Sequence, residues 1–197
     1  NLENSLDNKN AIVPKEIELT NASNNFTYNA PADSFSIIRL KTGNGGSKAY
    51  ISGYEDGTFR PDNTITRAEA AAIIARCSAD FDENKTYASD FTDVSDNEWY
   101  ANYVGYAAEK GYIHGYEGGP FKADIDITRG ELAVILSKYG SFDGDGICTE
   151  FSDVPNDYYA TEYIKALYDE NIVSGYEDGT FKPDNSVTRA EAGLLMN

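Results

Sequence analysis

The sequence predicts a mainly helical protein in which one unit is repeated three times. The first observation is a long repeat, in which residues 51–69 recur as 113–131 and again as 173–191. The second is the helical spacing of apolar residues within the copies, and the third is a shared Thr-Arg-x-Glu helix start. These patterns together predict the same helices at corresponding places along the chain.

The first residues of the chain do not belong to the repeat and read as strands. Residues 15–19, 25–29 and 34–40 are rich in β-forming residues and are separated by Asn-rich and Pro-containing breaks. Because two or three strands alone are marginal in water, we expect residues 1–41 to be the last β-strands of an upstream β-sandwich in a longer polypeptide. The Gly-rich residues 42–48 have the composition of a flexible linker.

A second block precedes only the last two copies of the repeat. Residues 91–101 match residues 151–160 if one residue is deleted. Apolar residues then fall at helical spacing over 99–110 and 158–170, which predicts an amphipathic opening helix in each of these two copies. The first copy has no such block, so we expect it to lack the opening helix.

Each repeated block predicts a tight turn followed by a second helix. The turn is marked by Gly-Tyr and Asp-Gly or Gly-Gly pairs. The helix begins with a Thr cap and a Glu three residues later, which is the pattern of a capping box. The capping pairs are Thr66 with Glu69, Thr128 with Glu131, and Thr188 with Glu191. The third helix reaches the end of the chain before completing its apolar face, so we expect it to be truncated.

Charge and composition exclude several classes of protein. The chain has 16 basic and 33 acidic residues and a net charge of −17, which argues against nucleic-acid binding. The longest apolar runs, 70–75 and 132–136, are too short to span a membrane. Cys77 and Cys148 fit neither a metal-binding spacing nor a disulfide framework, and residues 143–150 lack the register of a calcium loop. We therefore expect no metal, no cofactor and no catalytic residue.

The repeats resemble S-layer homology (SLH) modules, which carry a Phe-x-Asp-Val opening, an Ile-x-Gly-Tyr-x-Asp-Gly-Thr-Phe turn and a Thr-Arg-Ala-Glu helix start. The resemblance covers residues 49–197 and divides them into module 1 (49–88, without its opening helix), module 2 (89–148) and module 3 (149–197, truncated). It implies a three-pronged, pseudo-trimeric helical unit. Grooves between the prongs would bind pyruvylated secondary cell-wall polysaccharide, without catalysis, at the cell wall or S-layer of a Gram-positive-type bacterium.

Residues 1–41 resemble the C-terminal strands of large α-L-arabinofuranosidases. The resemblance rests on short stretches such as Phe26-Thr-Tyr28 and residues 31–39. Three hypotheses follow: a wall-binding anchor, the C-terminal fragment of a surface-anchored arabinofuranosidase whose active site lies upstream, and a structural module that self-associates in a surface lattice.

Three arginines are the first candidate ligand residues, namely Arg67, Arg129 and Arg189. Each follows the Thr cap, where a cation opposes the positive end of the helix dipole by about 0.3–1 kcal/mol. A bound carboxylate would compensate for this cost, because free N–H groups and a guanidinium fork both suit an anion. A structural salt bridge to a neighbouring acidic residue is the alternative, and the sequence leaves both open.

The remaining candidates surround these arginines in the sequence. The turn cations Arg60, Lys122 and Lys182 would make each turn locally electropositive, or they would be solvated turn residues. Trp99 and its aligned partner Tyr158 would stack on sugar faces, or they would belong to the core. The set is completed by Asp93, Asp153, Gly57, Gly119 and Gly179, the glycines serving backbone geometry or close ligand approach. We interpret His114 as a surface turn residue.

Overall fold

The structure, a computed structural model, describes residues 49–144, 146–148 and 150–195. All of them fall within one unit of the chain, Ser47–Asn197. The strands predicted over 15–19, 25–29 and 34–40 and the linker predicted over 42–48 lie outside the described residues. No helix in the described ranges is both long enough and apolar enough to cross a membrane.

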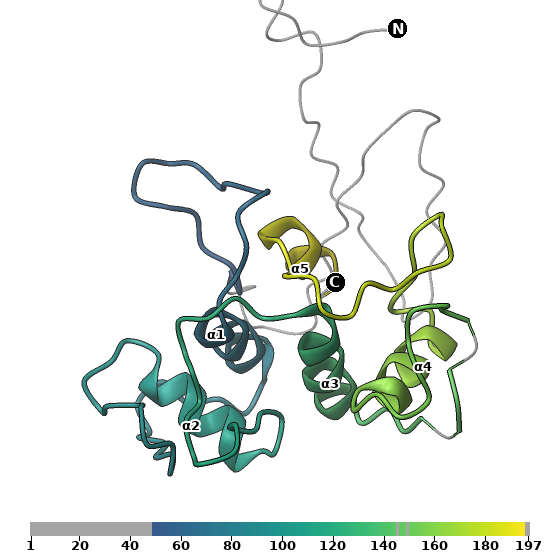
Figure 1. Cartoon of the computed structure of the whole chain (residues 1–197). Coiled ribbons are helices and arrows are strands. Elements are labelled where there is room, and N and C mark those ends of the chain that lie inside the picture. The colour runs from purple at the N-terminus through teal and green to yellow at the C-terminus, as the bar shows by residue number, and fades with distance from the viewer. Residues whose placement is uncertain (1–48, 145, 149, 196–197) are drawn as a thin grey trace, which may run out of the picture. The chain divides into compact units, whose positions relative to one another are not determined.

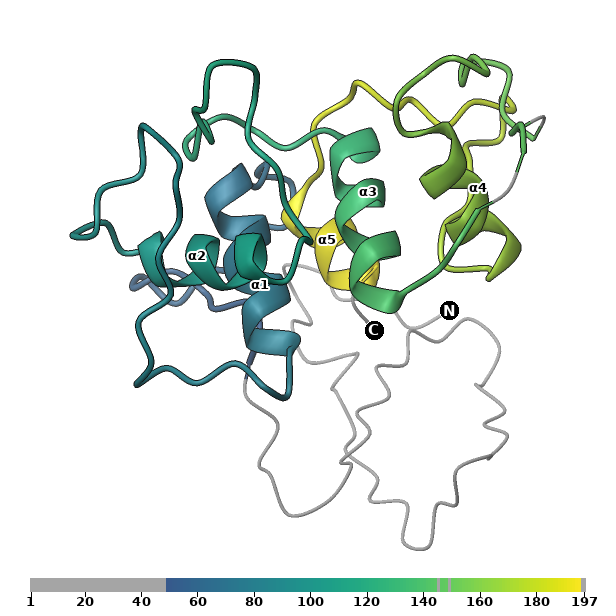
Figure 2. The same cartoon turned by 90° about the horizontal axis from the view of Figure 1, so that it is seen from below.

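The described part of the chain is mainly helical, as predicted. Its helices are α1 (Arg67–Cys77), α2 (Ala101–Glu109), α3 (Arg129–Gly140), α4 (Thr161–Asp169) and α5 (Arg189–Leu195). In the described ranges there are isolated β-bridges but no strands. The three second helices of the repeat, α1, α3 and α5, gather together, while the opening helix α2 packs against α1 and α4 packs against α3 (Figures 1 and 2).

The capping boxes predicted from the sequence are present at all three second helices. At α1 the Thr66 side chain accepts a hydrogen bond from Glu69 N, and the Glu69 carboxylate accepts one from Thr66 N at 2.8 Å. The same reciprocal pair forms at Thr128 with Glu131 and at Thr188 with Glu191. Each box satisfies two backbone donors, because the first N–H groups of a helix have no partner within it.

A closed ring of backbone hydrogen bonds joins the three copies. Ile65 N–H donates to Val187 O at 2.9 Å, Val187 N–H to Ile127 O at 3.0 Å, and Ile127 N–H to Ile65 O at 3.0 Å. All three residues have 0% exposed surface. Each lies at the corresponding place just before its Thr cap, so three segments far apart in sequence meet at one buried point.

The helix starts complete this ring. Arg67 N and Ala68 N at the start of α1 donate to Ile125 O and Ala123 O in the turn of the second copy. The start of α3 donates to Asn185 O and Pro183 O in the third copy, and the start of α5 donates to Asn63 O and Pro61 O in the first. Each module therefore caps the helix of the preceding one, and module 1 caps module 3.

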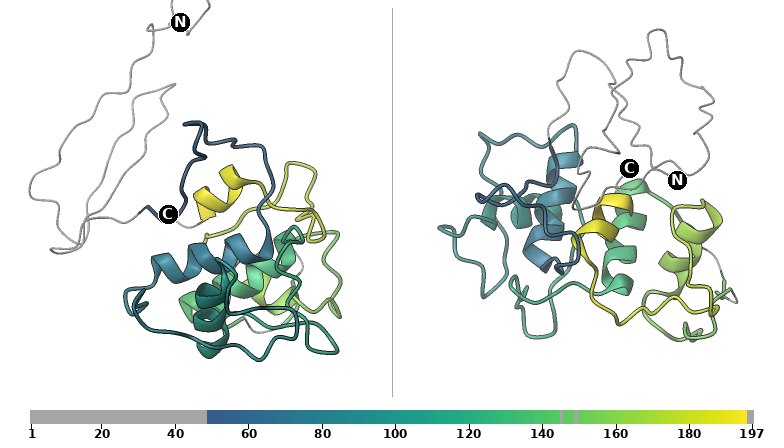
Figure 3. Two further views of the ribbon diagram at one scale, coloured as in Figure 1. Left: turned by 90° about the vertical axis from the view of Figure 1, so that its left-hand side faces the viewer. Right: turned by 90° about the horizontal axis from the view of Figure 1, so that it is seen from above.

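The hydrophobic core runs through all three modules. One cluster of buried side chains includes Ile74, Val104, Leu132, Ile164 and Phe181. The first four belong to α1 to α4, and α5 adds Ala192, so every helix contributes to this cluster. A smaller aromatic cluster between α1 and α2 is built around Tyr106 and Tyr87, with Phe81 packed against it. Figure 3 shows the helices that carry these clusters from the side and from above.

Gly105 in the middle of α2 generates a stability prediction. A Cβ atom at this position would lie 2.0 Å from the backbone oxygen of Tyr87, so Gly105→Ala must displace backbone. Alanine gains about 1 kcal/mol of helix propensity over glycine, but overpacking of this kind costs about 1–3 kcal/mol. We expect a lower melting temperature by circular dichroism.

Gly193 in α5 is the matched control. The nearest atom to its added Cβ would be Ile51 Cδ1 at 3.7 Å, an ordinary contact. Gly193→Ala should therefore leave the melting temperature unchanged or raise it. A rise of similar size in both variants would contradict the close approach of α2 to Tyr87.

Candidate functional site

Arg67 lies at the junction between modules 1 and 2. Its Nε donates to Phe121 O and its Nη2 to His114 O, both at 2.9 Å. Its Nη1 pairs with the Glu131 carboxylate at 2.8 Å. Arg67 is 6% exposed, and all three of its nitrogens have partners from module 2.

Arg189 repeats this arrangement between modules 3 and 1. Its Nε donates to Phe59 O at 2.9 Å and its Nη2 to Ser52 O at 2.6 Å. Its Nη1 lies 3.7 Å from Glu69 Oε1. Arg189 therefore joins the third copy of the repeat to the first, just as the corresponding Arg67 joins the first copy to the second.

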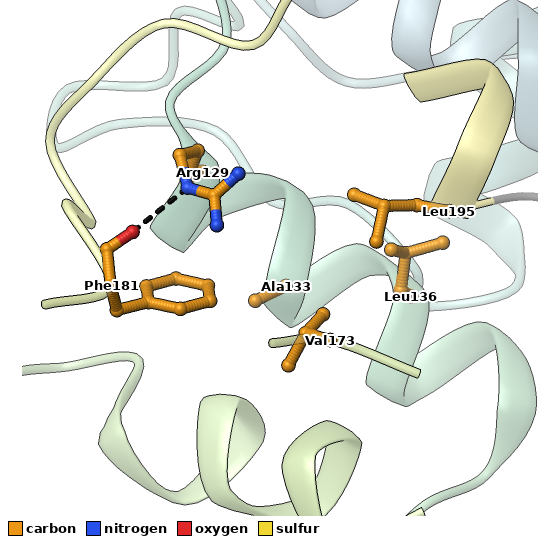
Figure 4. Close-up of a pocket in the computed structure, with 6 residues that line it drawn as sticks. All are labelled: Arg129, Ala133, Leu136, Val173, Phe181 and Leu195. Atoms are coloured by element: carbon orange, nitrogen blue, oxygen red, sulfur yellow. Dashed lines mark hydrogen bonds between the residues drawn. The ribbon is translucent and has the colours of Figure 1, made fainter. Parts of the chain in front are cut away.

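Arg129, between modules 2 and 3, is held by fewer contacts. Its Nε donates to Phe181 O at 2.8 Å, and its Nη1 lies 3.5 Å from Glu191 Oε1. Its Nη2 makes no hydrogen bond to the residues that the structure describes. Arg129 borders a small, otherwise apolar pocket lined by Ala133, Leu136, Val173, Phe181 and Leu195 (Figure 4).

These contacts correspond to the structural alternative for the three arginines. The expectation of free backbone N–H groups beside them is wrong, because a neighbouring turn caps each helix start, as Ile125 O does for Arg67 N. The positive charge of each guanidinium is offset by the capping glutamate of the next module. This pairing explains why a cation is tolerated at the positive end of the helix dipole. Direct contact between the arginines and a ligand stays a prediction.

A tyrosine contacts both cations of each junction. The Tyr116 ring lies 4.7 Å from the Arg67 guanidinium and 4.4 Å from Lys122 Nζ, and its hydroxyl donates to Glu131 at 2.5 Å. Burial and this hydrogen bond raise the pKa of Tyr116 to about 12. The corresponding sets are Tyr176 with Arg129 and Lys182, and Tyr54 with Arg189 and Arg60. Each tyrosine ring thus contacts one junction arginine and one turn cation.

The turn cations share an unusual backbone conformation. The φ angles of Arg60, Lys122 and Lys182 are 54°, 57° and 56°, in the left-handed region. In module 2 the Asp93 carboxylate accepts hydrogen bonds from Phe121 N at 2.6 Å and Lys122 N at 2.8 Å. Burial raises the pKa of Asp93, but these backbone donors outweigh it and the net pKa is lowered.

Asp153 has the same position in module 3 as Asp93 has in module 2. Its carboxylate accepts from Phe181 N at 2.7 Å and from Lys182 N at 2.8 Å. Successive N–H groups of this kind form a concave anion-binding site called a nest. In these two modules a carboxylate of the chain itself occupies the nest.

The structure corrects the partner of Trp99. The predicted one-residue deletion would pair Trp99 with Tyr158, yet α2 and α4 are offset by 60 residues throughout, as the bonds Val104 N to Tyr100 O and Ile164 N to Ala160 O show. Trp99 therefore corresponds to Tyr159, and both are 56% exposed. Sequence reasoning missed Tyr159, although the helical spacing alone, aligned without a gap, would have identified it.

Tyr158 packs against the hydrophobic core, which corresponds to the second of its two predicted roles. It is half-buried, and its hydroxyl donates to Asp184 Oδ1 at 3.1 Å. Burial and the neighbouring Tyr159 raise its pKa. A Cβ atom on Gly130 would lie 2.6 Å from this hydroxyl, which accounts for glycine where the other two copies have alanine.

The three candidate turn glycines fit their geometric interpretation. Gly57, Gly119 and Gly179 have φ angles of 78°, 96° and 77°, which side chains rarely adopt. Close approach of a ligand to them stays a prediction.

His114 is exposed, as interpreted, but it takes part in two contacts. Its carbonyl accepts from Arg67, and its imidazole Nε2 contacts Lys138 Nζ on α3. Burial and the Lys138 charge both lower the pKa of His114. A neutral imidazole therefore adjoins the junction between modules 1 and 2.

A family model described as "S-layer homology domain" matches residues 47–71, 90–133 and 150–192. Cell surface glycoprotein 1 of Acetivibrio thermocellus is 39% identical over 164 residues, which is 78% of this chain and 7% of that protein. The cellulosome-anchoring protein of the same organism is 37% identical over 79% of this chain and 36% of its own length. An amylopullulanase of Thermoanaerobacterium thermosulfurigenes is 31% identical over 76% of this chain and 8% of its own. The chain thus spans well under half of each of these relatives.

Arg67 generates a prediction about stability. Arg67→Lys keeps the charge but cannot reach three acceptors in a planar fork. A buried acceptor that loses its hydrogen bond costs about 1–3 kcal/mol, so we expect a lowered free energy of unfolding in urea titrations. Arg60→Lys, at an exposed turn position, is the control and should change stability by only about 0.5 kcal/mol. Equal stability of both variants and the parent chain would show that the Arg67 contacts contribute nothing.

His114 generates a prediction about pH. Its pKa is lowered from the ordinary 6.5 in the folded chain, so the unfolded chain binds the proton more readily. The stability that is linked to the neutral His114 imidazole is present above about pH 6.5, and it is lost as the pH falls below that value toward the pKa of the folded chain. His114→Gln should reduce the decline in melting temperature over this interval. Lys138→Met should reduce it too, and identical declines in all three chains would contradict the coupling.

Proposed function

Since the chain belongs to the S-layer homology domain family, we propose that it tethers a larger polypeptide to the wall by binding pyruvylated secondary cell-wall polysaccharide. The chain is a cell-wall anchoring module, and its location is the cell wall or S-layer of a Gram-positive-type bacterium. The tether itself performs no catalysis in this proposal.

The proposed architecture is a pseudo-trimeric unit of three modules, 49–88, 89–148 and 149–197. The ring formed by Ile65, Ile127 and Val187 supports it, because each residue has the same role at its own junction. The cyclic order of the arginine contacts supports it independently. The grooves then lie where one module's turn faces the opening block of the next.

One observation carries the ligand assignment: exposed cations and exposed aromatics accompany the turns. Tyr159 of module 3 lies close enough to Tyr116 of module 2 to influence its pKa, and Lys122 lies on the Tyr116 ring. An ammonium group suits the carboxylate of a pyruvyl ketal, and a flat aromatic suits a sugar face. We assign Lys122 and Tyr159 to one groove.

The other candidates are placed by analogy with this groove. Trp99 is the exposed aromatic of module 2, and Arg60 and Lys182 are the turn cations of modules 1 and 3. Arg67, Arg129 and Arg189 hold the turns so that these cations face outward. The Nη2 atom of Arg129, which makes no hydrogen bond to the described residues, could donate to a ligand.

A second proposal concerns the polypeptide that the tether carries. An enzyme attached to the tether is compatible with relatives named amylopullulanase and exoglucanase XynX. The proposal that this enzyme is an α-L-arabinofuranosidase rests on the resemblance of residues 1–41 alone, and the sequence upstream of Asn1 would test it.

Binding of the chain to purified wall polymer tests the proposed function. Hydrogen bonds to charged groups are worth about 1.5–3 kcal/mol, so Lys122→Met should weaken binding about ten- to a hundredfold. Tyr159→Ala should weaken it about two- to tenfold through lost aromatic contacts. Polymer stripped of its pyruvyl ketal should bind the parent chain as weakly as Lys122→Met binds intact polymer.

Two exposed positions serve as controls. Lys85 pairs with Glu109 on the surface, and Tyr168 is an exposed tyrosine on α4. Lys85→Met and Tyr168→Ala should bind like the parent chain. Equal affinity for intact and ketal-free polymer would refute the carboxylate assignment, whereas equal loss in test and control variants would refute the groove.

A further inference from the structure

The nests of modules 2 and 3 are filled by the chain's own opening blocks. In module 2 the Asp93 carboxylate binds the two N–H groups of Phe121 and Lys122, and Thr92 N–H donates to Gly119 O at 3.1 Å. In module 3 Asp153 binds Phe181 N and Lys182 N, and Ser152 N–H donates to Gly179 O at 3.0 Å.

A phenylalanine two residues before each aspartate completes the contact. The Phe91 ring stacks on Phe121, with centroids 5.2 Å apart, and it covers Gly115 so closely that a Cβ there would lie 2.8 Å from the ring. Phe151 covers Phe181 and Gly175 in the same way in module 3. As a result Phe121 is 1% exposed and Phe181 is 2% exposed.

Module 1 has the same turn without this cover. Arg60 has the left-handed φ of its counterparts, and Tyr54 N–H donates to Thr58 O at 2.9 Å as in the other turns. Phe59, however, is 42% exposed. Among the residues that the structure describes, Phe59 N and Arg60 N have no acceptor, and an added Cβ on Gly53 would meet only backbone atoms of Thr58.

We propose that the module 1 turn is a docking site for a Phe-x-Asp-Val segment from outside these 197 residues. The aspartate would bind Phe59 N and Arg60 N, the phenylalanine would stack on Phe59 over Gly53, and a backbone N–H would reach Gly57 O. The two filled modules show that this turn conformation accepts such a segment. This site shares Arg60 with the proposed polysaccharide contacts, but it uses the backbone N–H of Arg60 rather than the side chain, and it does not depend on the polysaccharide proposal.

The 197 residues hold no unused segment of this kind. Residues 1–48 contain no Phe-x-Asp sequence, because Phe26 and Phe35 are followed by Thr-Tyr and Ser-Ile. The Phe-x-Asp-Val segments of residues 91–94 and 151–154 are already in use. The Arg189 guanidinium, 4.9 Å from the Phe59 ring, borders the open turn.

Peptide titration tests the proposal on the full 197-residue chain. The probe is a fluorescein-labelled synthetic peptide with the sequence of residues 90–100, followed by anisotropy. We expect saturable binding, and an Asp93→Asn peptide should bind about ten- to a hundredfold more weakly because it loses a charge-assisted pair of hydrogen bonds. A Phe91→Ala peptide should bind at least as weakly. These peptide changes leave the protein itself untouched.

A protein variant locates the site. Gly53→Leu fills the slot for the phenylalanine ring and should abolish binding, whereas the control Gly111→Asn, a remote turn position with φ 73°, should not change it. Melting temperatures of both variants verify the fold. Absence of saturable binding, equal affinity of the Asp93→Asn peptide, or undiminished binding to Gly53→Leu would each overturn the proposal. A concentration-dependent dimer of the parent chain that Gly53→Leu disrupts would also overturn it, by assigning the turn to a second copy.

Discussion

The fold depends on the ring of three hydrogen bonds among Ile65, Ile127 and Val187. Around it, each helix start is capped by the next module's turn and each arginine by that turn's carbonyls. Buried N–H groups without partners cost about 1–3 kcal/mol each, so a single module would leave its helix start unsatisfied. The ring therefore makes the modules mutually dependent and holds all three turns in place.

The buried arginines show how a local conflict is resolved by tertiary structure. A guanidinium at the first turn of a helix opposes the helix dipole, yet Arg67 and Arg189 are almost fully buried there. Their partners are carbonyls and a capping glutamate of the neighbouring module, which neutralise the charge and use its planar geometry. The same glutamate caps its own helix, so one carboxylate serves two modules.

Local features of the sequence predicted the helices, the capping boxes and the turn glycines, because each depends on residues within one or two turns of chain. The ring could not be predicted, since its partners are 60, 62 and 122 residues apart in the sequence and carry no special side chain. Tyr159 was missed for another reason. Matching Trp99-Tyr100-Ala101 to Tyr158-Tyr159-Ala160 by residue type required a gap, whereas the phase of the helix, fixed by Val104 and Ile164, requires none.

Repetition of sequence does not make the three turns equivalent. Each turn has a residue with a left-handed backbone at the same position and a tyrosine that contacts two cations, so the intrinsic chemistry of the three turns is nearly identical. What differs is the segment that covers each turn: Asp93 and Phe91 cover one, and Asp153 and Phe151 another. The turn of module 1 differs by the lack of such a segment among the described residues rather than by any substitution of its own. In a ring built from copies, the absence of one covering segment is enough to convert a structural contact into a surface that can bind.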